Sequence, residues 1–173
     1  MTSQLRVDKI LPVDGAPTGG GGGVIQVKTV TKTDKFITAS QTPVDITGFS
    51  VAITPKFSTS KILVMYSLNV SGNSGYGSFR LARDNDNTIL IGDASGNQER
   101  STYGTYVSSS NIQNVSGTVL DSPSTTSAVT YKMQAYNPYS SSYLTAINYQ
   151  QGDANLSYIN VVPSVLTVME VSS

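Results

Sequence analysis

Hydrophobic residues recur at every second position along most of this chain, and the spacing of three to four residues that marks a helix is missing. The clearest segment is KILVMYSLNV, residues 61–70. Its alternating positions are Ile62, Val64, Tyr66, Leu68 and Val70. Leu63 and Met65 make its first half apolar on both faces, as in a strand that is covered on two sides. We therefore predict a central strand here.

The same alternation predicts further strands, and clusters of Gly, Asn, Asp, Ser and Pro separate them. They are expected at residues 24–32, 50–54, 76–84, 87–92, 102–109, 115–120, 128–136, 143–150 and 164–171. Many short strands at such spacing, with no helical segment, are typical of an all-β sandwich or a jelly roll. We expect a jelly-roll β-sandwich head over residues 24–173.

The last expected strand, SVLTVMEV at residues 164–171, is mostly apolar on both of its faces. A single small sandwich leaves one face of each sheet in water, so a second apolar face indicates a partner subunit. We therefore predict a subunit interface that includes Leu166, Val168 and Met169. A central strand covered by a long loop would give the same pattern.

Length and charge restrict the class of protein. A chain of 173 residues accommodates one domain and a tail, and its 11 basic and 11 acidic residues cancel. A balanced charge argues against nucleic acid or an acidic membrane as the partner. No secretory signal pattern and no run of about 18 apolar residues is present, so we expect neither export nor a membrane span.

The residue types that are missing argue against an enzyme. The chain has no His and no Cys, and therefore lacks the commonest proton-transfer group, the commonest metal ligand and the best thiol nucleophile. Carboxylate pairs of the glycosidase kind are the remaining route to catalysis. We expect no catalytic residues and no cofactor.

An apolar segment followed by five glycines precedes the first expected strand. The five glycines, Gly19, Gly20, Gly21, Gly22 and Gly23, would form a hinge because glycine loses the most backbone entropy on ordering. No Lys-Ser or Lys-Thr closes the run, which argues against a phosphate-binding loop. Residues 1–23 are therefore expected to be an anchoring arm that docks onto another protein, although a loose tail would look similar. Its apolar anchors would be Leu5, Val7, Ile10, Leu11 and Val13.

Two loops carry candidate ligand groups. The segment from Asp84 to Asn87, with Asp93 nearby, offers oxygen ligands for calcium, but it lacks the glycine and the terminal glutamate of an EF-hand loop, and a hairpin turn explains it better. The loop AYNPYSSSY contains Tyr136, Tyr139 and Tyr143, a hydroxyl-rich aromatic surface of the kind that binds glycans. Tyrosines at the rim of a sandwich would also fit.

Several stretches resemble a known family. TPVDITGFSVAITPKFSTSKILVMYSLNV (residues 42–70) and the closing LTVMEV are similar to the trimeric jelly-roll heads of the tumour-necrosis-factor and complement-globular-head type, as found in bacteriophage fibre and virion proteins. The opening LRVDKILPVDG resembles the arms of small phage fibre proteins. The resemblance implies a homotrimer whose last strand lies near the trimer axis, and it implies no catalytic residues.

These observations lead to three functional hypotheses. The first is a virion protein made in the host cytoplasm, a trimeric tail fibre or tip that faces the host surface, is docked to another virion protein by its arm, and contacts a surface glycan. The second is a capsid decoration protein whose trimer sits on the shell. The third is a lectin-like binding module.

Overall fold

The computed structural model describes residues 23–85, 87–150, 157 and 159–172. This part of the chain forms strands and loops without a helix, and none of it could cross a membrane as a helix. Its strands are β1 (Val24–Lys32), β2 (Phe36–Thr38), β3 (Val44–Ile53), β4 (Lys61–Gly72), β5 (Tyr76–Arg83), β6 (Asn87–Leu90), β7 (Tyr103–Tyr106), β8 (Gln113–Asp121), β9 (Val129–Tyr136), β10 (Thr145–Ile147) and β11 (Ser164–Val171). The expected all-β class is confirmed.

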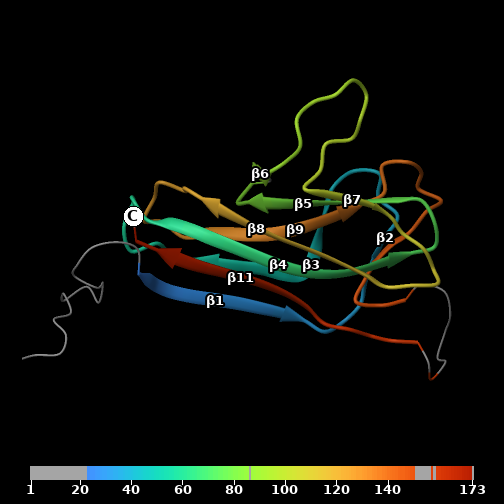
Figure 1. Ribbon diagram of the computed structural model, residues 1–173, viewed down its shortest axis with the longest axis horizontal. Coiled ribbons are helices and arrows are strands. Elements are labelled where there is room, and N and C mark those ends of the chain that lie inside the picture. Colours follow the sequence, from blue (N-terminus) through green and yellow to red (C-terminus); the bar gives the residue numbers. More distant parts are fainter. Residues whose placement is uncertain (1–22, 86, 151–156, 158, 173) are drawn as a thin grey trace, which may run out of the picture.

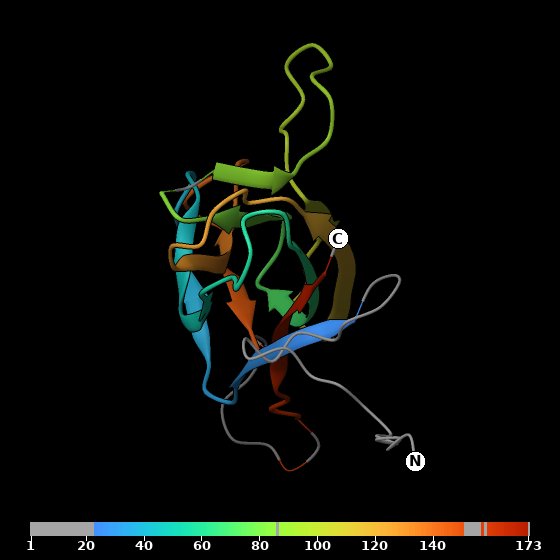
Figure 2. The ribbon, with the colours of Figure 1, turned by 90° about the vertical axis from the view of Figure 1, so that its left-hand side faces the viewer.

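The strands form two antiparallel sheets that enclose one core (Figures 1 and 2). In the first sheet β1, β11 and β4 are neighbours, β8 pairs with the other edge of β4, and β10 followed by β2 continues beside the last residues of β4. In the second sheet the order is β3, β9, β5, with β6 and β7 both paired to β5. The architecture is therefore a β-sandwich.

The core lies between the inner faces of the two sheets. β4 alternates between buried and partly exposed residues along its first ten positions, and its inward residues are those that the sequence pattern selected. From the second sheet, Phe79, Leu81, Tyr131 and Met133 are fully buried against them. Each such side chain contributes about 1.5–3 kcal/mol on leaving water.

The two ends of the sandwich can be told apart, because the first and last described residues both lie at one of them. β1 and β11 run side by side, and the backbone NH of Ser172 donates to the Gly23 carbonyl at 3.0 Å, so both ends of the described chain lie together (Figure 1). We call the end that contains Gly23, Lys61 and Ser172 the proximal end. The other end of β4, with Gly72 beside Thr145, is the distal end.

A buried glutamate closes the proximal end. Glu170 belongs to the inward face of β11 and is 0% exposed. Its Oε1 accepts a hydrogen bond from the backbone NH of Lys56 at 2.7 Å, and its Oε2 accepts one from Gln26 Nε2 at 2.6 Å. Among the described residues no ion pair involves Glu170. The charge is thus stabilised by NH donors, which fasten the loop after β3 to the last strand.

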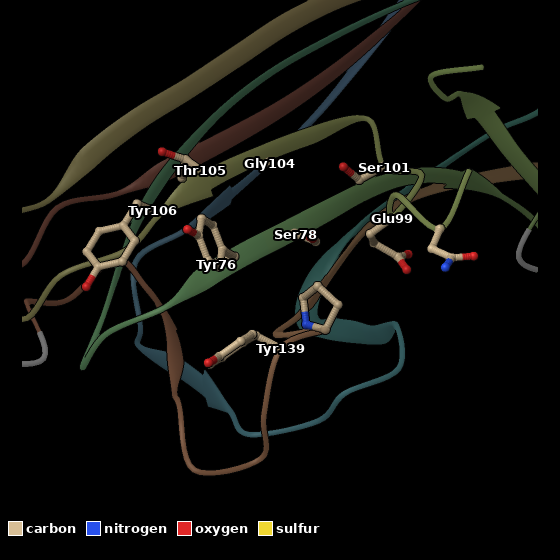
Figure 3. Close-up of a pocket in the computed structure, with 11 residues that line it drawn as sticks. Tyr76, Ser78, Glu99, Ser101, Gly104, Thr105, Tyr106 and Tyr139 are labelled. Carbon is tan, nitrogen blue, oxygen red and sulfur yellow. The ribbon is translucent and has the colours of Figure 1, made fainter. Parts of the chain in front are cut away.

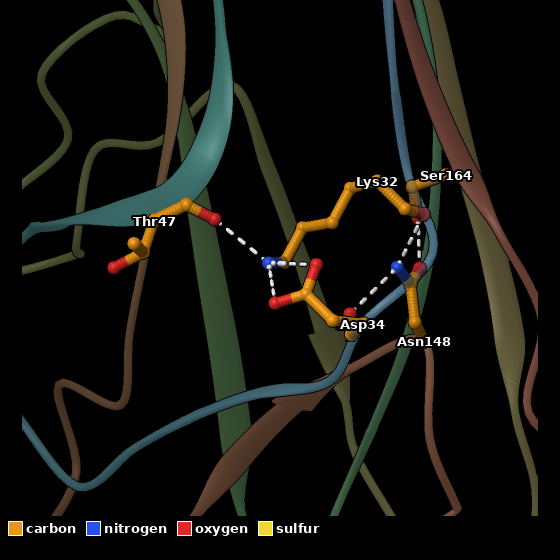
Figure 4. Close-up of polar contacts among 5 residues, drawn as sticks. All are labelled: Lys32, Asp34, Thr47, Asn148 and Ser164. Atoms are coloured by element: carbon orange, nitrogen blue, oxygen red, sulfur yellow. Dashed lines mark hydrogen bonds and ion pairs between the residues drawn. The ribbon is translucent and has the colours of Figure 1, made fainter.

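A second buried polar cluster joins β1 to the segment between β10 and β11 (Figure 4). Lys32 Nζ donates to the Thr47 carbonyl at 2.7 Å and to both carboxylate oxygens of Asp34 at 2.9 Å. Asn148, with a left-handed φ of 63°, donates from Nδ2 to the Lys32 carbonyl at 2.7 Å. Ser164 donates to Asn148 Oδ1. These bonds satisfy the backbone where β1 ends.

Candidate functional site

An open cleft lies on the outer face of the second sheet, at its distal end. Its floor is the pairing of β5 with β7, in which Tyr76 lies opposite Tyr106 and Ser78 lies opposite Gly104. Directly opposite residues of antiparallel strands share one face, so these four residues form one surface. The cavity volume is about 600 Å³. Its lining comprises Tyr76, Gly77, Ser78, Asn97, Glu99, Ser101, Gly104, Thr105, Tyr106, Pro138 and Tyr139.

Three exposed tyrosine rings border this cleft (Figure 3). Tyr76, Tyr106 and Tyr139 expose 58%, 53% and 65% of their surface, far more than an aromatic residue that belongs to a core. Tyr76 meets Tyr106 edge-on at a centroid distance of 5.7 Å and Tyr139 edge-on at 6.2 Å. Tyr143 stacks on Tyr139 at 5.5 Å. The contacts hold the rings in place while leaving much of their surface open to a ligand.

A carboxylate with a fixed position lies among the polar lining residues. Glu99 Oε1 accepts hydrogen bonds from Arg80 Nη2 at 2.8 Å and from the Tyr136 hydroxyl at 2.6 Å. Burial, and then this hydrogen bond to Glu99, raise the pKa of Tyr136 to about 12, so its hydroxyl remains a donor at neutral pH. Glu99 Oε2 has no hydrogen-bond partner among the described residues. It is a free acceptor beside the cleft.

The structure places the three tyrosines of the predicted ligand loop differently. Tyr139 lines the cleft and Tyr143 supports it by stacking. Tyr136 is 1% exposed, because Arg80 lies over its ring at 5.2 Å and Glu99 holds its hydroxyl, so its assignment to a ligand surface is corrected. The sequence does not indicate Tyr76, Tyr106 and Glu99 as lining residues. The pairing of β5 with β7 brings Tyr76 and Tyr106 together, and the loop before β7 brings Glu99 to the same cleft as Tyr139.

A second candidate surface is the outer face of the first sheet. Across β1, β11, β4 and β8 the strand register aligns outward residues in three rows. The rows are Val27, Met169, Leu63 and Leu120; Thr29, Thr167, Met65 and Thr118; Thr31, Val165, Ser67 and Ser116. None of these residues is charged, and Val27 and Leu120 are 49% and 50% exposed. We call this surface the uncharged face.

The predicted interface residues divide between the two sides of this sheet. Met169 lies on the uncharged face. Leu166 and Val168 are 0% exposed and belong to the core of the sandwich itself. Their assignment to a subunit interface is corrected, because their burial is accounted for within one chain.

The predicted arm residues Leu5, Val7, Ile10, Leu11 and Val13 lie outside the described residues, as do Gly19, Gly20, Gly21 and Gly22. Gly23 is described, and its NH donates to Ser172 Oγ at 2.9 Å while its carbonyl accepts from the Ser172 NH. Gly23 therefore prolongs the pairing of β1 with β11, and its assignment to a free hinge is corrected.

The candidate calcium segment is a hairpin turn. β5 and β6 pair antiparallel on either side of it, which confirms the preferred interpretation. Asp84 Oδ1 accepts a hydrogen bond from the Thr130 NH at 2.8 Å, so this carboxylate is used in attaching the turn to β9. Within the described ranges, no group of three or more acidic residues is suited to hold a metal ion.

Comparison with known proteins gives one distant structural similarity and no sequence match. The sequence matches no protein-family profile and no curated protein. Among solved structures, a chain of the structure titled "Structure of infectious bursal disease virus Gx strain" is similar, with a TM-score of 0.40 and 12% identity. The match covers 99% of this chain and 44% of the viral chain, so this protein spans less than half of that chain's length.

Proposed function

We propose that this chain is a non-enzymatic structural protein of a bacteriophage virion, a trimeric jelly-roll head of the tail-fibre or tip type. The observation that carries the proposal is the uncharged face. An antiparallel sheet with one face in water normally carries charged residues there, whereas three successive rows across four strands carry only apolar residues, Ser and Thr, and no charge. We propose that further copies of the same chain cover the uncharged face.

The strand order supports the jelly-roll part of the proposal. The first sheet reads β1, β11, β4, β8 and the second reads β3, β9, β5, β7, so that early strands pair with late ones in both sheets. Long connections that cross between two sheets in this way are those of a double Greek key. This order agrees with the resemblance of residues 42–70 and of the closing strand to trimeric phage heads.

The attachment end and the cleft lie at opposite ends of the head, which favours a fibre or tip over a shell protein. The chain enters the sandwich at Gly23, at the proximal end, whereas the tyrosine cleft begins at Tyr76, just beyond the distal end of β4. The twelve residues of β4 separate these ends by about 35 Å at the usual rise of a strand. A head attached through residues 1–22 would therefore hold the cleft outward.

The test has two measurements. Light scattering on the purified full chain should give the mass of a homotrimer, and a monodisperse monomer would overturn the assembly. Quantitative mass spectrometry of purified particles should then find the protein in tail-appendage copy number. A copy number comparable with that of the shell subunits would instead support the capsid-decoration alternative, and absence from particles would leave the lectin-like module.

A further inference from the structure

The tyrosine cleft has the size of a small-ligand site. A cavity of about 600 Å³ falls inside the range of roughly 300–1,000 Å³ typical of such sites. It is open along one side, and Gly104 contributes no side chain to its floor. A Cβ atom built at Gly104 would meet only Ser101 Oγ, at 3.6 Å. The fold therefore does not require glycine at position 104, and the absence of a side chain there leaves a depression in the cleft.

The aromatic border favours a ligand with a flat, partly apolar face. Tyr76, Tyr106 and Tyr139 present ring faces and hydroxyls together, and their mutual contacts reduce the entropy that they lose on binding. Sugar rings carry C–H groups on one face, which pack against the electron-rich face of an aromatic ring. Their hydroxyls remain available for polar groups at the rim.

The polar lining is rich in groups without protein partners. Glu99 Oε2 and the side chains of Asn97, Ser78 and Ser101 have no hydrogen-bond partner among the described residues. A carboxylate only accepts hydrogen bonds, and it is matched by hydroxyl donors. Its negative charge disfavours an anionic ligand, and Arg80, the nearby cation, is already bound to Glu99 and to the Arg100 carbonyl. The lining thus selects neutral, hydroxyl-rich molecules.

We propose that this cleft binds a neutral saccharide, with a sugar ring against the tyrosines and sugar hydroxyls donating to Glu99. The proposal deepens the proposed function, because it names the ligand class at the outward end of the head. One chain supplies all of the lining residues, so binding does not depend on the trimer. The two ideas can therefore fail separately.

The test uses the full chain and saturation-transfer-difference NMR. The probes are methyl glucoside and methyl galactoside, each matched with its uronic acid counterpart, which differs by one carboxylate. Saturation transfer to the neutral glycosides and much weaker transfer to the uronates is expected. No transfer to either neutral glycoside, or equal transfer to both members of a pair, would overturn the proposal.

Three variants locate the site. Gly104→Val fills the floor and should abolish the transfer, whereas Gly92→Val, at a glycine with no atom within 4 Å of its Cβ position, should leave it unchanged. Glu99→Gln should weaken binding about tenfold, as expected for loss of a charge-assisted hydrogen bond. Undiminished binding by Gly104→Val would overturn the assignment. Light scattering on the same samples keeps a failure of trimerisation distinct from a failure of binding.

Discussion

Val168 and Met169 are neighbours in the chain, but they lie on opposite faces of the first sheet. Val168 pairs with Val64 and is 0% exposed, whereas Met169 pairs with Leu63 on the uncharged face. The same substitution at these two positions therefore has different physical consequences.

Val168→Asp should prevent folding, because an unpaired carboxylate in the core costs several kcal/mol. Met169→Asp should keep its strand content and release monomers, since it adds charge only where the other copies are proposed to pack. Ser50→Asp, at an exposed position of β3, is the control and should remain assembled. Circular dichroism and light scattering measure the two properties. A folded Met169→Asp trimer would exclude the uncharged face as the interface.

Glu170 should contribute to stability through the NH groups that it binds. Glu170→Ala removes the acceptor of the Lys56 NH and of the Gln26 amide, and should lower the free energy of unfolding by about 2–3 kcal/mol. Glu170→Gln retains one carbonyl oxygen and should lose less. Urea unfolding provides the comparison. Equal stability of all three proteins would show that the NH groups find other acceptors.

Alkaline pH should destabilise the fold through its buried tyrosines. The pKa of Tyr136 rises from 10.0 to about 12, and burial followed by the hydrogen bond to Asp121 raises the pKa of Tyr131 further. A raised pKa in the folded state means that the unfolded chain loses its proton first. The stabilisation is complete below pH 10 and is lost as pH rises toward 12.

Tyr136→Phe tests this dependence, because it removes one of the titrating groups. Between these pH values the variant should lose stability less steeply than the wild type, by at most about 1.4 kcal/mol per pH unit. Urea unfolding at a series of alkaline pH values measures the slope. Equal slopes would show that Tyr136 does not titrate in this window.

Deletion of residues 1–22 should leave the head intact and abolish its attachment to the particle. The truncated chain keeps Gly23 and therefore its two hydrogen bonds to Ser172. Replacing Leu5, Val7 and Ile10 by Ser should have the same effect at full length, since each apolar anchor is worth about 1.5–3 kcal/mol when fully buried. Thermal melting and the protein content of purified particles are the measurements. Normal incorporation of both variants would refute the anchoring role.

The alternation of apolar and polar residues predicts the bounds of a strand well where Gly or Pro residues border it. The bounds expected for β1 and β11 agree with the structure, because the glycine run precedes one and Pro163 precedes the other. β3 begins six residues before its predicted start at residue 50, since Gly48, with a φ of 73°, interrupts the period of two. β2 was missed because its three residues depend on pairing with β10.

The cleft could be predicted only in part, because it too depends on contacts between residues far apart in the sequence. A tyrosine-rich loop is visible in the sequence, and Tyr139 does line the cleft. The register that places Tyr76 opposite Tyr106 is a long-range property. The folding of Glu99 back onto Tyr136, which buries one tyrosine and leaves another exposed, also has no local signal.

The pairing of Gly23 with Ser172 determines how the head would respond to mechanical force. A pull on the arm against the distal end loads the β1–β11 hydrogen bonds from Gln26 to Lys32 in shear, so that they resist together. A pull on the arm against the C-terminus opens the same ladder one bond at a time. Because the chain has no native cysteine, Ser141→Cys supplies a unique distal handle for single-molecule pulling. We expect a higher rupture force in the first geometry, which is the direction in which a bound surface would pull on the particle.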